Sequence, residues 1–189
     1  MKRPSKPRLI AVDVTDAGAM LAVARRALGS PSGGGISHWD ASGVFQDLAV
    51  ADDAAGAPSP RTLLLLYAAD LAFRLRWEIK PAMAEGYTVV AAPYVETAVA
   101  FGRAAGVPAG WLENLFCFAP RATEHCFVHR AAKGGKYVDG FVGFGCARMR
   151  GKPGGRTPKQ ILSGAAAELR RIARRRATPD KRDTKKSRS

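Results

Sequence analysis

The first apolar run of the chain leads into the frame of a phosphate-binding loop. An expected buried strand, 8–14, passes through a short loop, 15–18, into an expected helix, 19–28. In the motif G-x-x-x-x-G-K-[ST], glycine amides wrap the phosphates, the lysine reaches them and the hydroxyl holds Mg²⁺. The order of elements favours nucleotide chemistry, although the stretch from Val14 to Leu21 contains no lysine.

Two histidines and a cysteine in a later apolar stretch have side chains that can bind a metal. On a strand, His125 and His129 share a face but lie about 13 Å apart at about 3.3 Å per residue, while Cys126 points to the opposite face. That separation is too large for one ion, so we expect no metal site here. Cys117, Cys126 and Cys146 show no paired spacing, which predicts reduced thiols.

A basic, glycine-rich segment precedes the last expected helix, 158–176. Thr157 and Gln160 form a capping box at the start of that helix. Glycine-rich backbone with cationic side chains before a helix N-terminus can bind an anion, and the alternative is a solvated loop. The candidate anion-binding residues are Arg148, Arg150, Lys152 and Arg156.

The longest expected elements come from the middle of the chain. Ser59 can cap a helix that begins at Pro60, and leucines and alanines then recur at three- and four-residue spacing, so one face is apolar. Pro81 is expected to kink the last turns and Gly86 to end the helix. The continuously apolar run 87–92 is typical of a strand buried in a parallel sheet.

These elements predict an α/β fold of three layers, with a mostly parallel sheet and helices on both faces. Ligands of open sheets bind beyond the carboxyl ends of the strands, where Pro93 and Tyr94 are expected. The 189 residues are enough for one domain with a core. We expect this domain to cover residues 1–176, followed by a basic, disordered tail at 177–189.

The formal net charge of +14 is concentrated at the C-terminal end. From Glu168 onward, ten Lys and Arg stand against three Asp and Glu, which is half of the net charge. Such a tail can bind nucleic acid or an acidic partner, or it can serve solubility alone; without interleaved aromatics it carries no sequence-reading information.

Two absences bear on the expected compartment. No apolar run approaches the ~18 residues of a membrane span, and no signal-peptide core follows the basic start. A cytoplasmic protein without membrane association is therefore expected.

The middle of the chain resembles a thymidylate kinase. In that family a leucine-rich helix ending in AADR leads through I-P-A-L-G to a strand that closes on DRY, and a further helix exits through APRPD. The likeness is fairly specific over residues 60–120 and weaker over 9–50, and it implies a P-loop NTPase-like, nucleoside monophosphate kinase-like fold. The matching segments here are 63–71, 79–86, 92–94 and 111–120.

The resemblance also implies where the phosphate loop falls, and the residues there differ from the family pattern. Val14 and Ala19 replace the two glycines, and a branched side chain at the first of them obstructs the turn. Met20 replaces the lysine and cannot offset triphosphate charge, and Leu21 replaces the hydroxyl residue. The resemblance therefore predicts a degenerate loop made of Val14, Gly18, Ala19, Met20 and Leu21.

For the acceptor nucleotide, the resemblance implies a dTMP-like pocket. Asp16 corresponds to an acid directed at the sugar hydroxyl. Tyr67 corresponds to the ring that stacks on thymine, with a position in the core as the alternative. The pocket would consist of Asp16, Tyr67, Arg74, Tyr94 and Glu96.

At three positions around this pocket, the residue type differs from that of the family. Leu71 replaces the arginine that contacts the base, although Arg74 follows on the same helix. Ala92 and Pro93 replace the aspartate and arginine that grip the monophosphate, which removes charge-assisted contacts and an electrostatic catalyst.

Together these features predict a degenerate thymidylate-kinase-like protein, a pseudoenzyme that lacks ordinary ATP-dependent phosphoryl transfer and binds a nucleotide, a partner protein or nucleic acid. One alternative is a working dTMP kinase that converts dTMP and ATP to dTDP and ADP with non-standard residues, with ATP and Mg²⁺ as cofactors. Another is a nucleic-acid-binding module whose fold is a platform for the basic tail. A homodimer or heterodimer is compatible with each.

Overall fold

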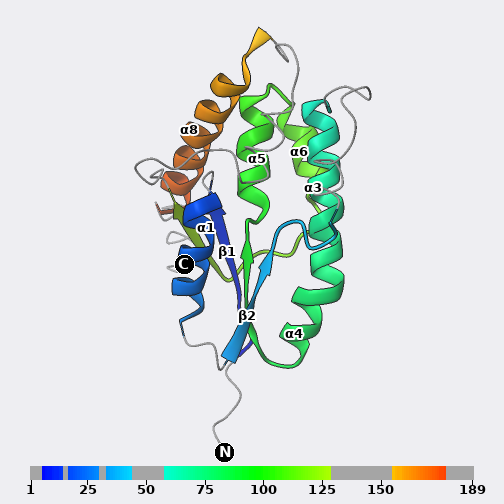
Figure 1. Ribbon diagram of the computed structural model, residues 1–189, viewed down its shortest axis with the longest axis vertical. Coiled ribbons are helices and arrows are strands. Elements are labelled where there is room, and N and C mark those ends of the chain that lie inside the picture. The colour runs from blue at the N-terminus through cyan, green and yellow to red at the C-terminus, as the bar shows by residue number, and fades with distance from the viewer. Residues whose placement is uncertain (1–5, 15–16, 30–32, 44–57, 129–154, 178–189) are drawn as a thin grey trace, which may run out of the picture.

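The computed structural model describes residues 6–14, 17–29, 33–43, 58–128 and 155–177. Within these parts, four strands form one sheet in the order β2-β3-β1-β4, and every pair of neighbours is parallel (Figure 1). The strands are β1 (Leu9–Val14), β2 (Gly34–His38), β3 (Thr88–Ala92) and β4 (Glu124–Val128). The helices are α1 (Ala17–Leu28), α3 (Pro60–Arg74), α4 (Lys80–Ala84), α5 (Val95–Ala104), α6 (Ala109–Leu115) and α8 (Pro158–Ala177), with a π-helical segment, η3 (Leu75–Ile79), between α3 and α4.

Helices cover both faces of this sheet, as the sequence predicts. Alternate residues of β1 and β3 point to opposite faces, because successive side chains of a strand alternate. Leu9 and Ala11 pack into a core with α3, α5, α6 and α8. Ile10 and Val12 pack on the other face against α1, through Met20 and Ala24. The three-layer α/β architecture is therefore confirmed.

The long central helix is capped as predicted, and its irregularity lies in the turn before Pro81. The Ser59 hydroxyl accepts a hydrogen bond from the Thr62 amide at 3.1 Å, and Gly86 ends the helical stretch with a φ of +89°. The π-helical segment, Leu75–Ile79, ends just before Pro81. Proline has no N–H to donate to the carbonyl four residues earlier, that of Trp77, so the altered hydrogen bonding falls in the preceding turn.

Two glycines before Ile36, Gly34 and Gly35, belong to β2. A Cβ added to Gly34 would lie 2.0 Å from the Thr88 carbonyl oxygen and 2.8 Å from a methyl carbon of Leu28. Glycine is therefore needed for the close approach of β2 to β3. A strand can thus use glycine where another backbone passes close by.

Helix α8 packs along α5 on one face of the sheet (Figure 1). Its predicted capping box is present: the Thr157 amide donates to Gln160 Oε1 at 2.7 Å, and the Gln160 amide donates to the Thr157 hydroxyl at 3.3 Å. The helix ends at Ala177, one residue beyond the expected end, and the predicted tail at 178–189 lies outside the described residues. No helix in the described ranges is long and apolar enough to cross a membrane.

Candidate functional site

The carboxyl ends of β1 and β3 meet at the first turn of α5, where Asp13 caps the helix from another element. Its Oδ1 accepts hydrogen bonds from the amide of Tyr94 at 3.1 Å and from the amide of Thr97 at 2.9 Å. The Thr97 hydroxyl lies 3.0 Å from the same oxygen and accepts from the Val14 amide at 3.1 Å. A carboxylate at a helix N-terminus satisfies amides that have no intrahelical partner.

The other oxygen of Asp13, Oδ2, is buried and has no hydrogen-bond partner among the described residues. The pKa of the carboxyl group is raised to about 7: burial is the largest cause and the nearby charge of Glu96 adds to it, while the hydrogen bonds of Thr97 and Tyr94 act in the opposite direction. The Asp13 carboxyl group therefore titrates close to neutral pH, and its Oδ2 can still form a hydrogen bond.

Tyr67 and Arg74, two of the predicted acceptor-site residues, fix the backbone that follows β3. The Tyr67 hydroxyl donates to the Tyr94 carbonyl at 2.6 Å, and Arg74 donates to the Pro93 carbonyl through Nη1 and Nη2 at 3.2 and 3.1 Å. Neither Tyr67 nor Arg74 is exposed to solvent. Tyr67 therefore lies in the core, which was the alternative to stacking on thymine.

A second residue of α3, Asp70, connects this network to the loop after β2. Its carboxylate accepts from Arg74 at 2.9 Å, from the Asp40 amide at 3.1 Å, and from the amide and hydroxyl of Ser42 at 3.1 and 2.9 Å. Asp70 was not among the predicted site residues. Its spacing of four residues from Arg74 on one helix was the available signal.

The predicted phosphate loop has an apolar interior. Met20, at the position of the family's lysine, is 3% exposed and packs with Val14, Ile10 and Val12 beneath α1, whereas Leu21 is 39% exposed. Residues 15 and 16 lie outside the described part of the chain. The described residues at these positions do not fit Mg-ATP, because none carries the cation or the hydroxyl that this ligand requires.

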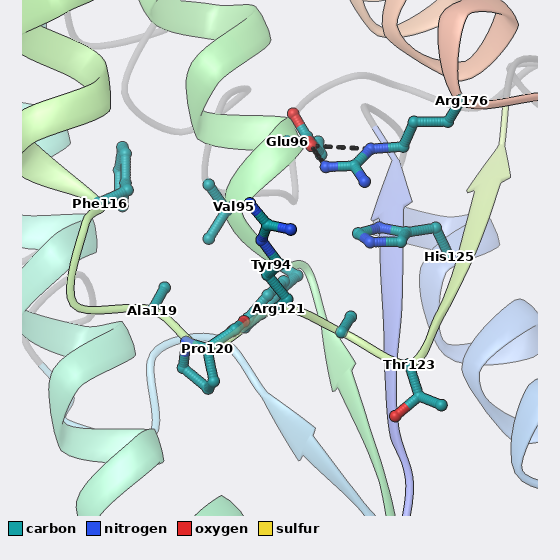
Figure 2. A pocket seen from close by; sticks show the side chains of 11 residues that line it. Tyr94, Val95, Glu96, Phe116, Ala119, Pro120, Arg121, Thr123, His125 and Arg176 are labelled. Atoms are coloured by element: carbon teal, nitrogen blue, oxygen red, sulfur yellow. Dashed lines mark hydrogen bonds and ion pairs between the residues drawn. The ribbon is translucent and has the colours of Figure 1, made fainter. Parts of the chain in front are cut away.

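A cavity of about 540 Å³ opens on the α5 face of the sheet, next to β4 (Figure 2). The first turn of α5, the last turn of α8 and the connection from α6 to β4 surround it. Tyr94 and Glu96, two predicted acceptor-site residues, line it, and Arg176 donates to Glu96 through Nε at 3.1 Å and through Nη2. The structure thus brings Tyr94 and Glu96 to one cavity and leaves Tyr67 and Arg74 in the core.

The remaining predicted residues are partly outside the described ranges. Asp16, Arg148, Arg150 and Lys152 lie there, as do His129 and Cys146. Arg156, from the predicted anion cluster, donates to the Ala104 carbonyl at the end of α5, where a cation interacts favourably with the helix dipole. Among the described residues, no three His, Cys, Asp or Glu gather closely enough to hold a metal.

This architecture, a parallel sheet with helices on both faces and a strand–loop–helix unit at its start, is a P-loop NTPase-like fold of the nucleoside monophosphate kinase type. The solved thymidylate kinase of Ehrlichia chaffeensis has a TM-score of 0.64 to this chain over 89% of it and 87% of the solved chain. At 10% sequence identity, that likeness concerns the fold alone.

Sequence comparison adds a family relationship. A protein of Pyrobaculum calidifontis named probable thymidylate kinase is 32% identical over 99 residues, 52% of this chain and 45% of that protein. A protein of Caldivirga maquilingensis with the same name is 42% identical over 53 residues, 28% of this chain and 26% of that protein. The matching segments thus span less than half the length of these relatives, and no family model matches. The chain is related to the thymidylate kinases.

Proposed function

We propose that this chain is a thymidylate-kinase-related pseudoenzyme that lacks ordinary ATP-dependent phosphoryl transfer and acts by binding a nucleotide, a partner protein or nucleic acid. The observation that carries the proposal is the environment of Met20. This side chain packs in the core between α1 and the sheet, at the position where the family's lysine would reach the phosphates. Even a lysine at this position would have to leave an apolar core to reach a nucleotide.

The acceptor side supports the same proposal. Arg74 is engaged with Asp70 and the Pro93 carbonyl, and Tyr67 with the Tyr94 carbonyl. These side chains close the loop after β3 instead of presenting charge or a ring face to a ligand. Ala92, which replaces the family's aspartate, is also buried. In the two regions where a kinase would hold its two nucleotides, these side chains therefore contact other parts of the chain instead of a ligand.

The test combines calorimetry with a turnover assay on the purified chain. Mg-ATP and dTMP are titrated separately, and formation of ADP and dTDP is followed with an active thymidylate kinase as the positive control. We expect no heat from Mg-ATP and no product. Binding heat from dTMP alone would support a nucleotide-binding role. No binding heat from either nucleotide would favour a partner protein or nucleic acid as the ligand. Stoichiometric conversion of dTMP to dTDP would overturn the proposal.

A working dTMP kinase is the alternative, and the family relationship together with the extent of the fold match favours it. In that case, ATP and Mg²⁺ would be the cofactors, and Asp16, Tyr94 and Glu96 would act at the acceptor. Tyr67 and Arg74 would have to leave their buried positions. Phosphoryl transfer that is lost in Glu96→Gln would support this alternative.

Binding of nucleic acid or an acidic partner through the basic C-terminal region remains part of the proposal. The described end of α8 already supports it, because Arg170, Arg171, Arg174 and Arg175 are all exposed on this helix. Arginines one turn apart repel one another, and a polyanion relieves that repulsion. We also keep the proposed boundary between a domain at 1–176 and a tail at 177–189, a cytoplasmic location and a homodimer or heterodimer as parts of this proposal.

A further inference from the structure

The cavity beside β4 shares Tyr94 and Glu96 with the predicted acceptor site but lies away from Met20 of the predicted phosphate loop. It lies over the α5 face of the sheet and reaches from Glu96, at the start of α5, to Thr123, just before β4 (Figure 2). Met20 and the predicted phosphate loop lie on the opposite face, beneath α1. A ligand in this cavity would therefore lie beside two predicted acceptor-site positions and away from Met20.

One part of the cavity wall is apolar. Val95, Phe116, Ala119 and Pro120 line it together with Tyr94. The Tyr94 hydroxyl is already occupied, because it donates to the Pro120 carbonyl at 2.6 Å. Tyr94 and Phe116 are buried behind this wall, at 2% and 5% exposure. Its accessible apolar surface comes from Val95, Ala119 and Pro120 and suits a flat apolar body.

The opposite part of the lining is cationic. Arg121 is exposed and has no hydrogen-bond or ion-pair partner among the described residues. Arg176 is neutralised by Glu96, to which it donates through Nε and Nη2. The three charges leave a net charge of +1 at this end of the cavity, which matches one negative charge on a ligand.

His125 supplies a second, independent feature of the same lining. Its Nδ1 is buried without a hydrogen-bond partner among the described residues, and its ring is stacked on Phe127 with centroids 5.9 Å apart. Burial, and then the charge of Arg176, lowers the pKa of His125, so the ring is neutral at neutral pH and can form a hydrogen bond. His125 thus has an unsatisfied ring nitrogen beside the cavity, which a ligand atom can satisfy after a turn of the ring.

We propose that this cavity binds a small organic carboxylate with a flat apolar body. The body would lie against Val95, Ala119 and Pro120, and the carboxylate would accept from Arg121 and from the His125 imidazole. The ion pair of Glu96 and Arg176 forms the far wall and adds no net charge. A single carboxylate balances the +1 of the lining, whereas a doubly charged phosphate monoester would leave one charge unmatched.

The probe for this proposal is naphthoate, with naphthamide as its uncharged counterpart. Titration of the full chain is followed by calorimetry and by the NMR signals of the His125 imidazole. We expect saturable binding of naphthoate with a shift of the His125 signals, and binding of naphthamide weaker by about tenfold or more.

Variants separate a specific site from general attraction to a basic protein. Arg121→Gln should weaken naphthoate binding by about tenfold or more. The matched control is Arg26→Gln, which removes the same charge from an exposed position of α1 on the other face of the sheet. His125→Phe keeps a ring next to Phe127 and should weaken binding by removing the ring nitrogens. The proposal is overturned by the absence of saturable binding in the millimolar range, by equal losses in the Arg121 and Arg26 variants, or by unchanged His125 signals.

Discussion

The guanidinium of Arg74 donates to the carboxylate of Asp70 across 2.9 Å, and neither side chain is exposed to solvent. Asp70 also holds the loop after β2 through Asp40 and Ser42, while Arg74 holds the Pro93 carbonyl after β3. The pair therefore joins two loops at the carboxyl edge of the sheet to one helix. Its role in this structure is to position backbone.

Replacing Arg74 by methionine should destabilise the chain by about 3–5 kcal/mol, because it leaves a buried carboxylate without its cation. The free energy of unfolding in urea measures the effect. The control is Arg76→Met, two residues away on an exposed position, which should change stability by less than about 0.5 kcal/mol. Similar losses in the two variants would show that the buried pair is not the cause.

Asp13 should make the stability of the chain depend on pH. Its pKa is about 7 in the folded state and 3.8 in the reference state, so the folded chain keeps a proton that the unfolded chain has released between these values. The contribution of this group is fully present below about pH 4 and is lost as pH rises towards 7, by at most about 1.4 kcal/mol per pH unit. Asp13→Asn should flatten this part of the stability profile, measured by urea unfolding at several pH values.

The control for that measurement is Glu113→Gln, which removes an exposed acid of α6. Its profile should be parallel to that of the unchanged chain. A profile of Asp13→Asn that is also parallel would contradict the assignment of this pH dependence to Asp13.

Met20→Lys tests the phosphate loop directly. The new ammonium group would be buried among Val14, Ile10 and Val12, so we expect a loss of stability of about 3 kcal/mol or more and no gain of Mg-ATP binding. Leu21→Lys, at the neighbouring exposed position, adds the same charge and should be tolerated. Thermal unfolding and calorimetry with Mg-ATP provide the two readouts. A stable Met20→Lys variant that binds Mg-ATP would show that the loop can still be made to work.

Removal of the residues after Ala177 should lower the salt dependence of binding to a short single-stranded DNA. Each phosphate contact that is lost reduces the slope of log K against log salt by about 0.7. Fluorescence anisotropy at several salt concentrations measures the slope. An unchanged slope would restrict any polyanion binding to the described part of the chain, including the exposed arginines of α8.

The sequence predicted the helices and strands better than the hydrogen bonds that join them. The cap at Ser59, the turn at Gly86 and the capping box at Thr157 are set by residues within a few positions of one another, so the local sequence predicts them. The bonds from Thr97 to Asp13 join residues 84 positions apart. Their existence depends on which strands lie next to each other, and no spacing in the sequence reveals that order.

The candidate site was predicted only in part for a related reason. The resemblance identifies which positions correspond to ligand-binding residues, but it does not tell whether their side chains face a ligand or the core. Tyr67 and Arg74 face the core because Pro93 and Tyr94 have carbonyls that need donors there. The cavity residues Arg121, His125 and Arg176 come from three segments, and the sequence offers no common pattern for them.

The contact of Gly34 with Thr88 also limits which substitutions this position can accept. A strand at the edge of a sheet usually accepts many substitutions and can slip in register or pair with a strand of another molecule. In β2, any side chain larger than a hydrogen at Gly34 would collide with the backbone of β3, so we expect almost every missense change at this codon to destabilise the fold. Gly34 stands in a glycine- and serine-rich stretch that suggests tolerance to substitution, yet its surroundings accept glycine alone.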